Sequence, residues 1–283
     1  LRTTARVMLA NLSGFDPAED LVAAEDRLRL DRWAVDCAAR LQESLRQAYD
    51  AYQFHLVCHR LHNFCASEMG GFYLDVIKDR QYTTQADSRP RRSAQTALYR
   101  IVDAMARWMA PILSFTADEI WENLPGERED TVFVAGWGQP LLRLGARDAL
   151  DGAFWESLIA VRVAVNRQLE TLRAAGDLRG SLDAEVTLYA DDALLTRLAR
   201  LEDELRFVLI TSEARVRPLA EAPEEAAETD VEGLKVVAGK SGAEKCERCW
   251  HRREDVGSDP THPTLCARCV TNVAGSGEER RFA

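Results

Sequence analysis

The chain has 283 residues, of which 46% are apolar and 29% are charged. This composition excludes an intrinsically disordered chain, and the length is sufficient for two domains with hydrophobic cores. Its apolar runs fall short of the roughly 18 residues that a membrane-spanning helix requires, and residues 1–14 lack the apolar core of a signal peptide. We therefore expect a cytoplasmic protein with no membrane partner. Residues 1–14 indicate part of a helix, and we expect the chain to be a fragment of something longer.

The net charge is −10, but the charges are unevenly distributed. Residues 221–232 contain six acids and no base, and we expect them to form a solvated loop. Residues 77–100 contain six bases and two acids, and residues 245–283 contain seven bases and six acids. Local basic clusters of this kind can contact phosphate groups although the whole chain is acidic.

The N-terminal half predicts an antiparallel helical bundle between residues 30 and 125. Apolar residues recur there every three or four positions in three successive segments. Gly70-Gly71 predicts a break after the second helix. Thr116 and Glu119 have the spacing of a capping box, which predicts the start of a further short helix.

The C-terminal half predicts a small α+β unit followed by a separate module. Its periodicity indicates helices at about residues 152–176 and 191–205, and strands at 184–190, 213–219 and 234–240. The fold class is therefore mainly α, with a small α+β domain. We divide the chain into residues 1–28, a connector; 29–135, a helical domain; 136–150, a linker; 151–240, the α+β domain; and 241–283, a metal-binding module.

Four of the seven cysteines form two Cys-x-x-Cys pairs: Cys246 with Cys249, and Cys266 with Cys269. The sixteen intervening residues fall within the range typical of zinc ribbons, so the pattern predicts one Zn²⁺ held by four thiolates. Because four protein ligands leave no position for water or substrate, the metal is expected to be structural.

The rival interpretations of these thiols are weaker. A thioredoxin-like redox centre needs only one pair, and two disulfides suit a secreted protein. Because four thiols already complete a zinc site, we expect His251 and His262 to be polar surface residues. The remaining cysteines, Cys37, Cys58 and Cys65, lie in apolar helical patterns and are expected to be buried.

Between the cysteine pairs stand Trp250, Arg252 and Arg253, next to His251. An aromatic ring among cations suits RNA, because the ring stacks on a base and the cations contact phosphates. A solvated loop with the ring packed on the metal turn explains the same residues equally well. We find no phosphate-binding loop, dinucleotide-binding glycine motif or catalytic-triad spacing that would indicate another site, and assign no catalytic residue.

The segments KCERCW, CARCV and NVAGSGEERRFA resemble the C-terminal zinc module of bacterial isoleucyl-tRNA synthetases. The upstream segments LDRWAVDCAARLQESLRQAYDAYQFH, FYLDVIKDRQYT and RRSAQTALYRIVDAMARWMAPILSFTADEIW resemble the helices of their anticodon-binding domain. The resemblance covers the whole chain, and the zinc tail distinguishes it from the valyl and leucyl relatives.

The resemblance implies part of a class I isoleucine–tRNA ligase. This chain lacks the HIGH and KMSKS motifs that bind ATP, and the inserted domain that edits misactivated valine. We therefore expect a monomer that binds isoleucine tRNA but does not activate isoleucine alone. ATP would bind only in the missing catalytic domain, to which residues 1–28 would connect. The missing catalytic and editing domains would be its other partners.

The candidate tRNA-binding residues are the basic and aromatic side chains of these segments. They are Lys78, Arg80, Tyr82, Arg89, Arg91 and Arg92 in the bundle, and Trp250, Arg252, Arg253, Arg280 and Arg281 in the tail.

Two alternatives remain open from the sequence. Formamidopyrimidine-DNA glycosylases carry a similar C-terminal zinc module, but they also need an N-terminal catalytic proline that this chain lacks. A stand-alone RNA-binding zinc protein, with no enzyme attached, is the other.

Overall fold

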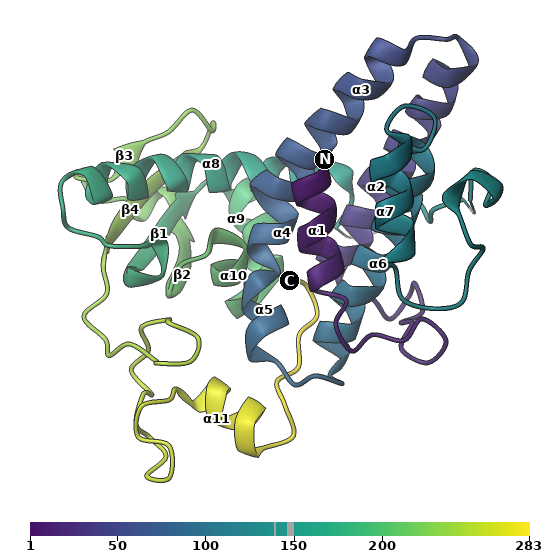
Figure 1. Cartoon of the computed structure of the whole chain (residues 1–283). Helices are drawn as coiled ribbons and strands as arrows, with labels where there is room; N and C mark the ends of the chain where they lie inside the picture. The colour runs from purple at the N-terminus through teal and green to yellow at the C-terminus, as the bar shows by residue number, and fades with distance from the viewer. Residues whose placement is uncertain (139, 146–149) are drawn as a thin grey trace. The chain divides into compact units, whose positions relative to one another are not determined.

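The computed structural model describes residues 1–138, 140–145 and 150–283. These residues form two compact units, unit 1 (Leu1–Asp151) and unit 2 (Gly152–Ala283), each with its own core (Figure 1). The linker expected at 136–150 includes residues 139 and 146–149, which lie outside the described residues. Within the described ranges, none of the helices combines the length and apolarity needed to cross a lipid bilayer.

Unit 1 is helical. Its elements are α1 (Arg2–Ala10), α2 (Arg29–Asp50), α3 (Phe54–Asn63), the π-helical η1 (Phe64–Tyr73), α4 (Leu74–Val76), α5 (Lys78–Thr83), α6 (Arg89–Met109), α7 (Ser114–Glu122) and the 3-10 turn η2 (Val132–Val134). The long helices α2 and α6 pack against each other, and α1 and α7 contact α6 (Figure 1). The bundle predicted from the apolar periodicity is therefore present.

The break predicted at Gly70-Gly71 does not occur. The chain winds through both glycines as the wide π-helical turn η1. A Cβ atom on Gly70 would lie 2.9 Å from the carbonyl oxygen of Cys65, five residues earlier. The glycines therefore permit the close approach of backbone atoms that this π-helical turn requires, instead of ending a helix.

Two other boundaries differ from the expectation. The helix α7 begins at Ser114 with Leu113 at its N-cap, so the capping box at Thr116 and Glu119 is wrong. The single helix expected at 191–205 is interrupted, because Glu202 has a left-handed backbone with φ 51°. Periodicity alone identifies helical residues but does not determine the local backbone kinks.

A charged network lies in the core of unit 1. Asp31 on α2 and Arg80 on α5 have no exposed surface and form a bidentate ion pair, one arm of which measures 2.8 Å. The Tyr73 hydroxyl donates to Asp31 at 2.7 Å, and the Ser93 hydroxyl also donates to it. Burial, and then the charge of Asp31, raise the pKa of Tyr73 well above its usual value. The network joins α2, η1, α5 and α6 through buried hydrogen bonds.

Unit 2 combines helices with a four-stranded sheet. Its elements are α8 (Gly152–Ala174), η3 (Ser181–Asp183), β1 (Ala184–Ala190), α9 (Asp192–Leu198), η4 (Ala199–Glu204), α10 (Leu205–Leu209), β2 (Glu213–Pro218), η5 (Leu219–Glu221), β3 (Ala227–Glu228), β4 (Leu234–Lys240) and α11 (Ala267–Ala274). The strand order is β2-β1-β4-β3, with β1 and β2 parallel and the other pairs antiparallel.

The sheet follows from the alternating pattern of β1. Its alternate residues Ala184, Val186, Leu188 and Ala190 are buried, and the residues between them are half-buried. The helix α8 packs on β4, while α9 contacts β1 and β2. All six acids of residues 221–232 are exposed, as expected of a solvated segment, although the short strand β3 lies within it.

The three isolated cysteines differ from one another in exposure. Cys65 is buried and Cys37 is half-buried. The expectation that Cys58 is buried is wrong, because α3 places it on its exposed face. The buried residues of α3 are Val57 and Leu61.

Candidate metal centre

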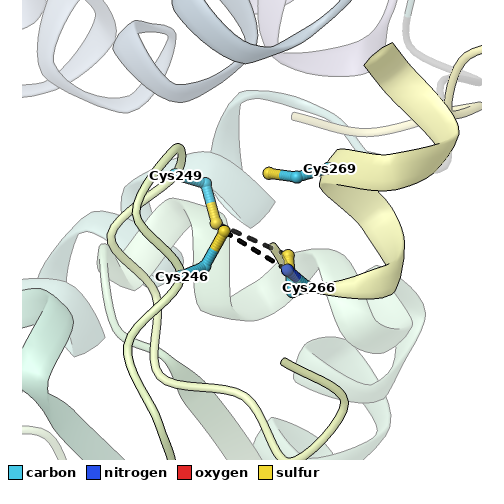
Figure 2. A group of neighbouring side chains, drawn as sticks. All are labelled: Cys246, Cys249, Cys266 and Cys269. Atoms are coloured by element: carbon cyan, nitrogen blue, oxygen red, sulfur yellow. Dashed lines mark hydrogen bonds between the residues drawn. The ribbon is translucent and has the colours of Figure 1, made fainter. Parts of the chain in front are cut away.

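The four paired cysteines converge in unit 2. They belong to a segment that we call the knuckle, residues 245–270. Cys246 and Cys249 lie on a tight hairpin, while Cys266 is the N-cap of α11 and Cys269 lies in its first turn. All four sulfur atoms lie within 4.8 Å of one another, and the four residues are at most 6% exposed (Figure 2).

Backbone hydrogen bonds set the direction of the first cysteine pair. The amide of Cys246 donates to the carbonyl of His251 at 2.9 Å, and the amide of Trp250 donates back to the carbonyl of Cys246 at 2.9 Å. Trp250 takes a left-handed backbone with φ 67° to close this turn. The turn brings both thiols of the pair to the same side of the hairpin (Figure 2).

Hydrogen bonds also link the two cysteine pairs. The Sγ atoms of Cys249 and Cys266 are 3.7 Å apart, and the amide of Cys266 donates to the Sγ of Cys246 at 3.4 Å. The thiol protons of Cys266 and Cys269 lower the pKa of Cys249. Conversely, the hydrogen bonds that Cys266 and Cys269 make with Cys249 raise the pKa of Cys266 to about 12 and also raise the pKa of Cys269. A metal cation at the centre would take the place of these protons and stabilise all four thiolates.

The four cysteines fit a structural zinc ion. Four sulfur ligands that converge to within 4.8 Å of one another can supply the four ligands that a d¹⁰ ion such as Zn²⁺ takes, and the four residues are buried. The cluster can therefore hold one structural Zn²⁺, as the cysteine spacing predicts.

His251 contacts both the cysteine cluster and α10. It is 1% exposed, so the expectation of a surface residue is wrong, whereas His262 is half-buried. Its ring stands edge-on to Phe207 on α10, with centroids 5.7 Å apart, and a hydrogen bond from His251 lowers the pKa of Cys249. Outer contacts of this kind orient a metal ligand and stabilise its thiolate.

Phe207 is also the centre of a group of guanidinium groups. The guanidinium carbons of Arg206, Arg268 and Arg280 lie 4.1, 5.1 and 3.5 Å from its ring centroid. Glu278 accepts from Arg268 at 3.1 Å and from Arg280 at 3.2 Å. Cation–π contacts and one shared carboxylate thus attach the C-terminal segment and α11 to α10.

Arg252 and Arg253 attach the knuckle to the sheet. Arg252 donates to Asp183 at 2.8 Å, and its amide donates to the Ser212 hydroxyl at 2.6 Å. Arg253 donates to Glu213 at 2.8 Å. The partner residues lie before or at the start of strands β1 and β2, far from the knuckle in sequence, and the local pattern of the knuckle does not predict them.

The candidate tRNA-binding residues fall into two groups. Those of unit 1 come from α5 and the start of α6, which pack against each other. Arg80 has no exposed surface and pairs with Asp31, so it is not accessible to RNA in this conformation. Tyr82 is 69% exposed, and Lys78 and Arg89 are also exposed.

The remaining two candidates of unit 1 are less accessible. Arg91 is half-buried. Arg92 pairs with Asp20 at 3.2 Å and donates to the carbonyl of Gly14 at 2.7 Å. Its guanidinium is therefore already engaged by partners within unit 1.

In unit 2 the candidates divide between surface and interior. Trp250 is 60% exposed, with the Lys245 ammonium 5.7 Å from its ring, and Arg281 is exposed and pairs with Glu202. Arg280 is 3% exposed and packs against the Phe207 ring, so it too is not accessible to RNA in this conformation. Arg252 serves the attachment to the sheet described above.

Comparison with known proteins shows which families the two regions of the chain resemble. Residues 31–188 match the family described as "Anticodon-binding domain of tRNA ligase", and residues 243–272 match "Zinc finger found in FPG and IleRS". The whole chain is 58% identical to isoleucine–tRNA ligases of Azotobacter vinelandii and Pseudomonas putida and 57% identical to that of Edwardsiella ictaluri.

The chain spans 30% of the length of these relatives. The anticodon-binding family covers more than half of the chain, and the zinc finger covers the knuckle. The chain belongs to the family of anticodon-binding domains of tRNA ligases, and over its whole length it is similar to part of the isoleucine–tRNA ligases.

Proposed function

We propose that this chain is the tRNA-recognition part of a class I isoleucine–tRNA ligase, an enzyme that attaches isoleucine to its tRNA with ATP. The observation that carries the proposal is the identity of 58% over all 283 residues, including both the anticodon-binding region and the zinc finger. We further propose the organisation expected above, from the connector at residues 1–28 to the module at 241–283.

In this proposal the chain holds the anticodon arm of isoleucine tRNA. Unpaired loop bases are read by stacking and by edge hydrogen bonds, while basic side chains fix the backbone. The exposed candidates Lys78, Tyr82 and Arg89 suit this task in unit 1. Trp250 and Arg281 suit it in unit 2, where the exposed indole offers a stacking surface.

The proposed metal ligands are Cys246, Cys249, Cys266 and Cys269, whose sulfur atoms converge in the knuckle. When bound, Zn²⁺ supplies a fourfold cross-link that holds the hairpin against α11. The protein's own residues then present Trp250, which directly follows the ligand Cys249 and donates its amide to the carbonyl of Cys246. Activation of isoleucine belongs to the catalytic domain outside this chain, so the chain alone is proposed to be inactive.

Filter binding of the purified chain to an isoleucine tRNA transcript tests this function. We expect binding at low salt that weakens steeply as salt rises, and that favours this transcript over one in which only the anticodon loop is replaced. An absence of binding at low salt, or equal binding of both transcripts, would contradict the proposal. Isoleucine-dependent ATP–pyrophosphate exchange by the chain alone would contradict its proposed inactivity.

One other function has a specific observation behind it. The description of the matched zinc finger also names FPG, so a DNA-repair role is the second candidate. A nicking assay on duplex DNA with an oxidised guanine distinguishes the two. We expect no nicking, because the anticodon-binding match extends over residues 31–188, outside the zinc finger.

A further inference from the structure

A second cluster of metal-binding side chains lies on α3 in unit 1. His55, Cys58, His59 and His62 are all exposed, and they include three of the five histidines of the chain. Val57 and Leu61 anchor the helix to the core of the unit. The helix forms one arm of a hairpin with α2 (Figure 1).

The spacing places these four side chains on one face. Successive residues of an α-helix turn by about 100°, so His55, Cys58, His59 and His62 fall within an arc of about 100°. His55 and His59 are one turn apart, as are Cys58 and His62. Side chains so spaced have Cβ atoms about 5–6 Å apart, which allows both to reach one ion at about 2.0–2.3 Å.

The donor set selects a class of metal. Imidazole and thiolate favour Zn²⁺, Co²⁺, Ni²⁺ and Cu²⁺, whereas Mg²⁺ and Ca²⁺ require oxygen ligands. The side-chain amide of Asn63 donates to the Nε2 atom of His59 at 3.0 Å, so His59 exchanges this hydrogen bond for the ion when it binds metal. Arg60 turns away from this face and donates to the carbonyl of Ser44 at 2.7 Å.

We propose that the exposed face of α3 binds one ion of the zinc class through His55, Cys58 and His59, with His62 as the neighbouring fourth donor. Among the described residues, only the knuckle thiols already converge on a common point. The α3 side chains must therefore rotate to close on the ion, and ordering them costs side-chain entropy. The site is accordingly weaker than the knuckle, and it leaves the ion open to water or to a ligand from a partner.

Isothermal titration of the full chain, with its knuckle already loaded with zinc, tests this site. We expect Zn²⁺ to bind as a second, weaker equivalent, and His59→Ala to abolish it. The control is His262→Ala, which removes a histidine outside α3 and leaves the second equivalent unchanged. Absence of a second equivalent, or its persistence in His59→Ala, would overturn the proposal.

Alkylation of Cys58 provides an independent readout. Because a metal-bound thiolate is shielded, added Zn²⁺ should slow modification of Cys58 by a maleimide by roughly tenfold or more. The protection should disappear in His59→Ala and remain in His262→Ala. A modification rate that does not respond to Zn²⁺ in the unsubstituted chain would also overturn the proposal, even if a second equivalent binds elsewhere.

Discussion

Arg252 and Asp183 form the ion pair that attaches the knuckle to the sheet, with the Arg252 Nε donating to Asp183 at 2.8 Å. Asp183 comes immediately before β1, and Arg252 comes just after the first cysteine pair. The same arginine also donates through its backbone amide to Ser212. The metal-binding segment of unit 2 is therefore part of one hydrogen-bonded structure with the strands.

Replacing Asp183 by Asn should loosen this attachment. The substitution removes the charge that the partly buried Arg252 contacts, and we expect a loss of about 1–3 kcal/mol in the free energy of unfolding of unit 2. Urea denaturation and amide exchange at residues 245–253 measure it. Asp177→Asn makes the same change at an exposed loop residue and should leave both unchanged. Equal effects of the two variants would show that the ion pair is not important.

The same ion pair predicts a dependence of stability on pH. Burial alone would raise the pKa of Asp183, but the hydrogen bond and charge of Arg252 outweigh it, so this pKa lies below the ordinary 3.8. A carboxyl whose folded pKa is lowered stabilises the fold above its unfolded pKa. This contribution should be complete at neutral pH and should disappear as the pH falls below about 3.8.

Urea unfolding at a series of acidic pH values checks this dependence. Because the knuckle thiolates also protonate in acid and release metal, the informative quantity is the difference between the unsubstituted chain and Asp183→Asn. That difference should shrink as the pH falls through the lowered pKa. A difference that stays constant down to the lowest pH would argue against the ion pair as its source.

Removal of zinc should affect unit 2 and spare unit 1. A chelator deprives the four thiolates of their shared cation, so the hairpin and α11 lose their cross-link. Because His251 and Arg268 pack on Phe207, we also expect faster amide exchange at α10. Mass-spectrometric exchange measures both regions, and circular dichroism should retain the helices of unit 1. Melting of the unit 1 helices together with zinc loss would contradict this prediction.

Replacement of Arg80 by Ala should destabilise unit 1 strongly. It leaves the fully buried Asp31 carboxylate without its bidentate partner, which costs about 3–5 kcal/mol. Thermal or urea unfolding measures the loss. The control, Arg89→Ala, removes an exposed arginine of α6 and should change stability by at most about 0.5 kcal/mol. If Arg80→Ala reduced tRNA binding without changing stability, Arg80 would instead act as an RNA contact.

Replacement of Trp250 by Ala should weaken the proposed tRNA binding. Loss of one stacked base corresponds to about 1–3 kcal/mol in binding free energy. Trp250→Phe should retain much of the affinity, because it keeps an aromatic face on the same turn. Filter binding at constant salt measures both, with zinc content as the check on folding. Equal affinities of the alanine variant and the unsubstituted chain would remove Trp250 from the binding surface.

The sequence by itself determined those features that depend on local spacing. Apolar residues at helical intervals identify α2, α3 and α6, and the alternation in β1 identifies its buried face, because one face of each element must leave water. Two Cys-x-x-Cys turns likewise identify a four-thiolate metal site, because each turn directs both sulfur atoms to one centre.

Only the tertiary structure decided which charged and aromatic residues are available at the surface. Arg80 and Arg280 look like any exposed arginine in the sequence, yet each is buried by a partner far along the chain. His251 was likewise expected at the surface, and Cys58 in the core. The physical reason is that burial of a polar group depends on whether distant residues supply its hydrogen bonds and charges, and local periodicity contains no information about those partners.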